Sequence, residues 1–133
     1  MDARTLAERI AEYVFENDHV SFAELSRKWP DHFDVPGAAY EYVISGDGPG
    51  GRGGFDNIVL WAGMSEVGVE AINLVRKDER VELKPAHQLV YLIDGGALRL
   101  PIATGMRRYK EPHWLPCTIA KKAMRSKRQG RIT

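Results

Sequence analysis

The sequence predicts one α+β domain followed by a basic tail. Three observations support this fold class. Helix-capping signals recur in the N-terminal third of the chain, strand-like apolar runs occupy the second half, and cations crowd the C-terminal segment. A chain of 133 residues with 44% hydrophobic residues can bury an ordinary core. We therefore expect one globular domain over residues 1–117 and a tail over residues 118–133 that becomes helical on binding.

Two capping boxes predict two short helices near the N-terminus. In residues 5–8 and again in residues 21–24, a hydroxyl side chain precedes a glutamate by three positions, so each can cap the first turn of a helix. The first helix has one apolar face, formed by Leu6, Ile10, Tyr13 and Val14. The second helix buries Phe22, Leu25 and Trp29. It ends near Trp29, because a residue before proline disfavours helical angles.

A third helix is expected between Asp34 and Ile44. Asp34 can cap it, and Pro36 suits its first turn. Tyr40, Val43 and Ile44 then fall on one apolar face. The first 44 residues are thus expected to form a unit of three helices.

The helix signals of this unit lie in four short runs: Arg9 with Ile10, Tyr13 with Val14, Val20 to Phe22, and Glu24 with Leu25. This order resembles the first two helices of a winged-helix DNA-binding domain, a helix-turn-helix fold. The resemblance implies a third helix that reads bases and a hairpin that forms the wing. The third helix departs from the family, because base reading uses Arg, Lys, Asn or Gln. The residues at its start are Val35, Pro36, Gly37, Ala38, Ala39 and Glu41.

Residues 45–54 contain six glycines and are expected to form a flexible connector. Residues 46–51 match the dinucleotide pattern G-x-G-x-x-G, which presents a helix N-terminus to a pyrophosphate. Here the strand-like residues 57–61 follow in place of a helix. We therefore reject a phosphate-cradling role for this loop.

A further helix is expected after Ser65, which can cap it. Its apolar residues are Val67, Ala71, Ile72, Leu74 and Val75. Arg76, Lys77 and Arg80 fall at its C-terminal end, where cations complement the helix dipole. That structural role explains them at least as well as phosphate contacts do.

Three strands are expected beyond this helix, in a short antiparallel β-meander. Residues 81–84 alternate, residues 89–93 are apolar throughout as in a central strand, and residues 98–102 alternate again. Pro101 cannot donate to a ladder, so the last strand is expected at an edge. Leu92, like Trp29, is expected in the core.

Charge is strongly segregated along the chain. Residues 1–103 carry 10 Lys and Arg against 17 Asp and Glu, a balance of −7, whereas residues 104–133 carry 9 against 1, a balance of +8. Such a basic arm favours a nucleic-acid partner. Two alternatives remain: a solvated tail that only keeps the protein soluble, or a tail that lies on its own acidic body.

The candidate nucleic-acid-binding residues are the cations of the second helix and of the tail: Arg27, Lys28, Arg107, Arg108, Lys110, Lys121, Lys122, Arg125, Lys127, Arg128 and Arg131. Tyr109 and Trp114 interleave with these cations and could stack on bases. The alternative is that both aromatics pack a proline-rigid strap onto the sheet. Thr118 could cap a basic helix that becomes ordered on a partner.

No catalytic, cofactor or metal site is expected. His113 and Cys117 are four residues apart, but neighbouring prolines argue against the helix that would align them, and a structural metal site usually needs four ligands. Cys117 is expected to be a packed small hydrophobe. The longest apolar run, residues 58–64, is too short for a membrane helix, and no signal peptide is evident, which favours a cytoplasmic protein.

The function expected from the sequence is DNA binding, as in a transcriptional regulator or an accessory factor. Phosphate contacts would come from the basic tail, with DNA favoured over RNA. The alternative is a protein-interaction module of winged-helix-like fold that docks a partner on its acidic helical face without reading DNA. Enzymatic activity is not expected, and the oligomeric state stays open.

Overall fold

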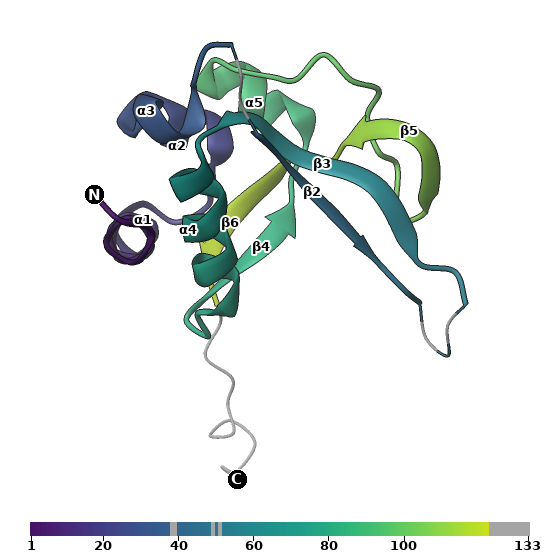
Figure 1. Ribbon diagram of the computed structural model, residues 1–133, viewed down its shortest axis with the longest axis horizontal. Coiled ribbons are helices and arrows are strands. Elements are labelled where there is room, and N and C mark those ends of the chain that lie inside the picture. Colours follow the sequence, from purple (N-terminus) through teal and green to yellow (C-terminus); the bar gives the residue numbers. More distant parts are fainter. Residues whose placement is uncertain (38–39, 49, 51, 123–133) are drawn as a thin grey trace, which may run out of the picture.

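Helices and two small sheets make up the computed structural model of this chain, which describes residues 1–37, 40–48, 50 and 52–122 (Figure 1). Each sheet has three strands. The first, named here the β6 sheet, has the order β1-β6-β4, and the second, the β3 sheet, has the order β2-β3-β5. The α+β class expected from the sequence is confirmed.

Helix α1 spans Ala3–Asn17 and begins earlier than the capping box indicates. The cap is Asp2, whose side chain accepts from the Thr5 N–H at 2.8 Å. Thr5 is therefore a donor in the first turn and not the cap, which was expected there. Because Asp2 is also a favourable cap residue, the helix extends by three residues toward the N-terminus. The expected apolar residues Leu6 and Ile10 are fully buried.

Helix α2 spans Phe22–Lys28 and is capped as expected. The Ser21 hydroxyl oxygen accepts from the Glu24 N–H at 3.0 Å. A separate single turn, α3, spans Pro30–Phe33 and starts with Pro30. Trp29 is partly buried and lies edge-on to Tyr13, with 5.9 Å between ring centroids, so it lies at the margin of the core.

The prediction of a helix between Asp34 and Ile44 is wrong. Residues Tyr40–Gly46 form strand β2, which pairs antiparallel with β3, Phe55–Met64. Aromatic and β-branched residues dominate β2, and they fit a pleated strand better than a helix once a partner is available. The strand expected after the glycine-rich segment is confirmed as part of β3, and the first two residues of that segment, Ser45 and Gly46, belong to β2.

Strand β5, Arg108–Trp114, adds to β3 in parallel register, with Val59 opposite Trp114. Helix α4, Glu66–Lys77, follows β3 and is capped by Ser65, whose hydroxyl accepts from the Gly68 N–H at 2.9 Å. This helix is confirmed as expected. A Cβ at Gly68 would lie 2.5 Å from the His32 carbonyl oxygen, so only glycine allows α3 to approach α4 this closely.

The β6 sheet joins distant parts of the chain. Its central strand β6, Cys117–Lys121, pairs with β1, Val20–Ser21, on one side and with β4, Val81–Pro85, on the other. Thr118 and Ile119 are buried. The prediction that a helix starts at Thr118 is therefore wrong, because residues up to Lys121 belong to the sheet, and the rest of the expected tail helix lies outside the described residues. The expected boundary after Cys117 falls inside this strand.

Helix α5, Gln88–Asp94, replaces the expected central strand. Tyr91 is fully buried, whereas Leu92 is 62% exposed, so the expected core position of Leu92 is wrong. A short apolar run is compatible with either a buried strand or a helix. Here the run forms a helix, which Gly95 ends by adopting the left-handed backbone conformation. Residues 98–102 contribute only a single bridge, between Ile102 and Trp114, so the expected meander is wrong.

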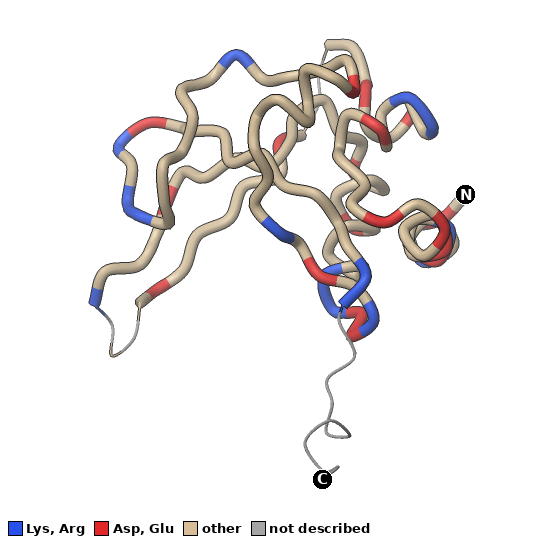
Figure 2. Tube along the Cα trace, turned by 180° about the vertical axis from the view of Figure 1, so that it is seen from behind, with Lys and Arg blue, Asp and Glu red and all other residues tan. Residues whose placement is uncertain are grey.

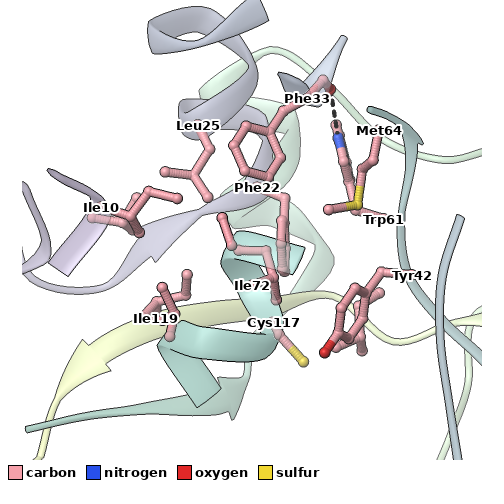
Figure 3. Packing of buried hydrophobic residues seen from close by; sticks show 14 of the residues in the cluster. Ile10, Phe22, Leu25, Phe33, Tyr42, Trp61, Met64, Ile72, Cys117 and Ile119 are labelled. Carbon is pink, nitrogen blue, oxygen red and sulfur yellow. Dashed lines mark hydrogen bonds between the residues drawn. The ribbon is translucent and has the colours of Figure 1, made fainter. Parts of the chain in front are cut away.

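Aromatic side chains link the helices to both sheets in one core (Figure 3). Phe22 of α2 stacks on Trp61 of β3 with 6.2 Å between ring centroids. Trp61 contacts Tyr91 of α5 at 5.7 Å, and Tyr91 contacts Trp114 of β5 at 5.0 Å. The Trp61 indole N–H donates to the Phe33 carbonyl oxygen at 2.9 Å. One continuous core therefore spans both sheets.

Candidate nucleic-acid interface

Cations from three elements meet where α4 ends and β6 ends. Val81 lies opposite Lys121 in the ladder, and the Lys122 N–H donates to the Arg80 carbonyl oxygen at 2.9 Å. Arg76, Lys77 and Lys122 line one cleft. Figure 2 shows blue Lys and Arg segments, with red Asp and Glu segments beside them, at this end of the molecule. We define the basic end as Arg76, Lys77, Arg80, Lys121 and Lys122.

Carboxylates fix part of the basic end in place. The Arg80 guanidinium donates to both Asp78 carboxylate oxygens, at 2.9 and 2.7 Å, and these bonds lower the pKa of Asp78. The Arg80 guanidinium also lies 5.1 Å from the centroid of the Phe15 ring. Arg80 is thus held in the fold, whereas the exposed side chains of Lys77, Lys121 and Lys122 make no ion pair within the described residues.

A backbone bond to α1 fixes the C-terminal end of β6. The Lys121 N–H donates to the Asp18 carboxylate at 2.9 Å. This bond is the main cause of the lowered pKa of Asp18. The chain therefore leaves the described fold at the basic end, beside the C-terminal ends of α1 and α4 (Figure 1).

The cations of β5 lie elsewhere and have a different role. Arg108 donates to the Asp56 carboxylate at 2.7 Å, to the Asp47 carboxylate at 3.2 Å and to the Gly53 carbonyl oxygen at 2.7 Å. Hydrogen bonds with Asp56 raise the pKa of Arg108 above its usual value. Arg108 therefore holds the glycine-rich connector against β5. Its neighbours Arg107 and Lys110 are exposed.

The aromatic residues of β5 belong to the fold. Trp114 is 2% exposed, so it cannot stack on a base in this structure. The Tyr109 ring lies 3.9 Å from the His113 ring, and its hydroxyl accepts from the Thr104 N–H at 2.9 Å and donates to the Gly105 carbonyl oxygen at 3.0 Å. Both aromatics lie in a strand of the β3 sheet and not in a strap packed onto it; Trp114 is buried, and Tyr109 is partly buried against the core.

Arg27 and Lys28 lie at the C-terminal end of α2, away from the basic end (Figure 2). The Lys28 ammonium lies 5.1 Å from the Tyr13 ring centroid and 5.4 Å from the Trp29 ring centroid. Tyr13 in turn donates to the Glu24 carboxylate at 2.5 Å, which raises the pKa of Tyr13 to about 12. Lys28 is therefore held against the rings of Tyr13 and Trp29, and the Glu24 carboxylate lies next to the Tyr13 hydroxyl.

The eleven candidate residues thus fall into separate groups. Only Lys121 and Lys122 belong to the basic end, while the β5 group and the α2 pair lie apart. Four candidates fall outside the described residues: Arg125, Lys127, Arg128 and Arg131. The candidate residues predicted from the sequence did not include Arg76, Lys77 and Arg80. Their proximity to Lys122 depends on the pairing of β4 with β6, which no local signal in the sequence indicates.

The outward side of α4 carries few groups that are available for base reading. The Tyr42 hydroxyl donates to the Asn73 side-chain oxygen at 2.5 Å and accepts from Arg76 at 3.2 Å. Glu66 and Glu70 are exposed on the N-terminal half of the helix. Asn73 and Arg76, the types of residue that recognise base edges, are therefore bonded to Tyr42 of β2, and the other exposed charges on the N-terminal half of the helix are the carboxylates Glu66 and Glu70.

Other chemistry finds little support in the described part of the chain. It contains no group of three or more His, Cys, Asp or Glu placed to hold a metal ion. Cys117 is buried, and burial raises the pKa of its thiol to about 12, so the thiol is protonated at neutral pH. Among the described helices, none has the length and apolar character needed to cross a membrane. The chain matches no protein-family model, no curated protein and no solved structure.

Proposed function

We propose that this chain is a winged-helix-like domain that binds duplex DNA through phosphate contacts at its basic end. The order of the elements supports the winged-helix part of the proposal. Helices α1, α2 and α4 precede the β4–β6 pair, and β1, between the first two helices, joins the same sheet. In this arrangement α4 takes the place of the third helix and β4–β6 that of the wing.

The observation that carries the DNA-binding part is the location of the basic end. Five cations meet there, at the point where the chain continues into residues 123–133. Those residues add Arg125, Lys127, Arg128 and Arg131 and contain no Asp or Glu. A cluster of cations continuous with a basic segment favours a polyanion, because each phosphate contact releases counterions from the duplex.

Sequence reading is not part of this proposal. Asn73 and Arg76 are bonded to Tyr42, and Glu66 and Glu70 would repel the phosphates around a groove. Phosphate contacts position a protein on a duplex but carry no sequence information directly. We therefore expect similar affinities for unrelated sequences.

The salt dependence of binding tests the proposal. The variant Lys77→Gln, Lys121→Gln, Lys122→Gln removes three exposed cations of the basic end. We expect weaker binding to two unrelated duplexes alike, and a slope of log affinity against log salt that is less steep by about 2.7, or 0.9 per phosphate contact. Fluorescence anisotropy over a series of salt concentrations measures both quantities.

A matched control carries the same charge change away from the basic end: Arg99→Gln, Arg107→Gln, Lys110→Gln. These residues are also exposed. The slope of log affinity against log salt for the control should differ from that of the parent protein by less than about 0.5. This is below the change of about 0.9 that the loss of one phosphate contact would cause. Equal losses in the two triple variants would show that net charge alone drives binding, and would overturn the assignment of the basic end.

An acidic row on α1 favours protein binding as a second candidate function. Glu8, Glu12 and Glu16 are exposed at successive i, i+4 positions, where like charges destabilise a helix. A basic partner segment would relieve that repulsion. Titration with a lysine-rich peptide, monitored by calorimetry, tests this candidate, because Glu8→Gln, Glu12→Gln, Glu16→Gln should abolish the heat of binding.

A further inference from the structure

A cleft of about 470 Å³ opens between the two sheets. One wall is a single face of the β4–β6 pair, because Leu83 lies opposite Ile119 and Pro85 lies opposite Cys117 in the ladder. Residues two apart on a strand share a face, so these four side chains form one apolar surface. Figure 3 shows Cys117 and Ile119 next to each other on this strand.

The opposite wall belongs to the β3 sheet and the segment around it. Ile44 of β2 and Leu60 of β3 line it, together with Leu115 and Met106. Leu60 is buried, Ile44 and Leu115 are partly buried, and Met106 is 51% exposed. Apolar side chains therefore face the cleft from both sheets, and its volume lies in the range of small-molecule sites.

Three cations and three carboxylates line one end of the cleft. Arg76, Lys77 and Lys122 line it there, together with Asp78, Glu79 and Glu82. Two of the carboxylates have partners: Asp78 pairs with Arg80 at 2.7 Å, and Glu82 pairs with Lys84 at 3.7 Å. No carboxylate among the described residues forms an ion pair with the three cations of the lining. The cleft is thus apolar along its walls, and at one end three cations without an ion pair face one carboxylate without an ion pair, Glu79, among the described residues.

Arg76 is the cation best placed to bind an anion. Its guanidinium donates to the Tyr42 hydroxyl at 3.2 Å and lies 5.8 Å from the Tyr42 ring centroid. These contacts use one of the five N–H donors and restrain the side chain, which leaves other donors for a carboxylate. A restrained guanidinium binds a carboxylate with less loss of side-chain entropy than a mobile lysine does.

We propose that this cleft binds a hydrophobic carboxylic acid, with its apolar chain between the two sheets and its carboxylate on Arg76. Two features define the ligand class: apolar walls contributed by both sheets, and three lining cations that form no ion pair among the described residues. A neutral apolar compound would contact only the apolar walls, and a short polar anion would contact only the cations. The site shares Arg76, Lys77 and Lys122 with the basic end, and the proposal does not rest on DNA binding, because the probes are titrated without DNA.

Calorimetric titration with three probes that share a ten-carbon chain tests the ligand class. Decanoate carries the carboxylate, decanol is neutral, and decyltrimethylammonium is cationic. We expect decanoate to bind at least about tenfold more tightly than decanol, the gain that one charge-assisted hydrogen bond supplies, and the cation to bind most weakly. Equal affinities for decanoate and decanol, or no saturable decanoate binding below millimolar concentration, would overturn the proposal.

Substitutions at the two ends of the cleft locate the probe. Arg76→Gln should weaken decanoate binding about tenfold and leave decanol unchanged, while Arg76→Lys should restore part of the loss. Arg99→Gln, a change of the same charge outside the cleft, should alter neither. Met106→Trp should reduce the affinity for both probes by filling the cleft. Circular dichroism melting of each variant verifies that it is folded. An unchanged decanoate affinity in either Arg76→Gln or Met106→Trp would show that the probe binds elsewhere.

Discussion

Lys121, in the last strand, donates its backbone N–H to the carboxylate of Asp18, directly after the first helix, at 2.9 Å. This bond connects residues 103 positions apart. It closes the β6 sheet onto α1 at the basic end. The contact therefore links the stability of the fold to the ionisation of a single exposed carboxylate.

The first prediction is an acid-sensitive contribution from Asp18. The bond from Lys121 lowers the pKa of Asp18 in the folded protein below its usual value of 3.8. A lowered folded pKa gives stability that is present above pH 3.8 and is lost as the pH falls through the folded value. Asp18→Asn should therefore melt below the parent at neutral pH, and the difference should shrink in acid. Melting by circular dichroism between pH 7 and pH 2 measures it.

The second prediction concerns the end of the fold. A truncation after Cys117 removes four of the five β6 residues and leaves β1 and β4 without their shared partner. We expect this protein to lose its cooperative melting transition. A truncation after Lys122 keeps both sheets and should retain a cooperative transition. If the shorter protein also melted cooperatively near the parent temperature, β6 would not be required for the fold.

The third prediction contrasts two apolar residues. Ile72 on α4 is fully buried, whereas Leu92 on α5 is 62% exposed. Ile72→Ala should lower the free energy of unfolding by about 2 to 5 kcal/mol, as for other emptied core sites. Leu92→Ala should change it by less than about 0.5 kcal/mol, like most surface substitutions. Urea denaturation measures both, and a large loss at Leu92 would contradict the exposed face of α5.

The fourth prediction concerns the buried hydroxyl of Tyr91. It accepts from the Phe22 N–H at 3.0 Å and donates to the Cys117 carbonyl oxygen, so it connects α2 and β6 through α5. Tyr91→Phe leaves two buried backbone groups without this partner and should cost about 1 to 3 kcal/mol of unfolding free energy. Tyr109→Phe, at the surface, is the control and should cost less. Equal losses would show that the buried hydroxyl has no special role.

Local signals in the sequence were sufficient to predict several helix starts. Ser21 and Ser65 both cap helices as expected, because a cap depends only on the few residues that follow it. Strand β3 also follows from its own apolar run. The α+β class could therefore be predicted from short segments of the chain.

Pairing between distant segments could not be predicted in the same way. Residues 40–46 and residues 88–94 are short apolar runs of similar length, yet the first is a strand and the second a helix. Residues 40–46 become a strand by pairing with β3, which lies outside both runs. The basic end has the same origin, because Arg80 and Lys122 are brought together by the β4–β6 ladder.

The position of β6 also has a consequence during synthesis on the ribosome. Its residues, Cys117–Lys121, lie between β1 and β4 and complete the hydrogen bonding of both neighbours. A growing chain that has just produced α4 and β4 therefore lacks the central strand of that sheet. The helices can form early, since their contacts are local, but long-range strand pairing is slow and waits for β6. Until then the inner edges of β1 and β4 have no β-strand partner from their own chain, and this interval is when a chaperone would protect the nascent protein most.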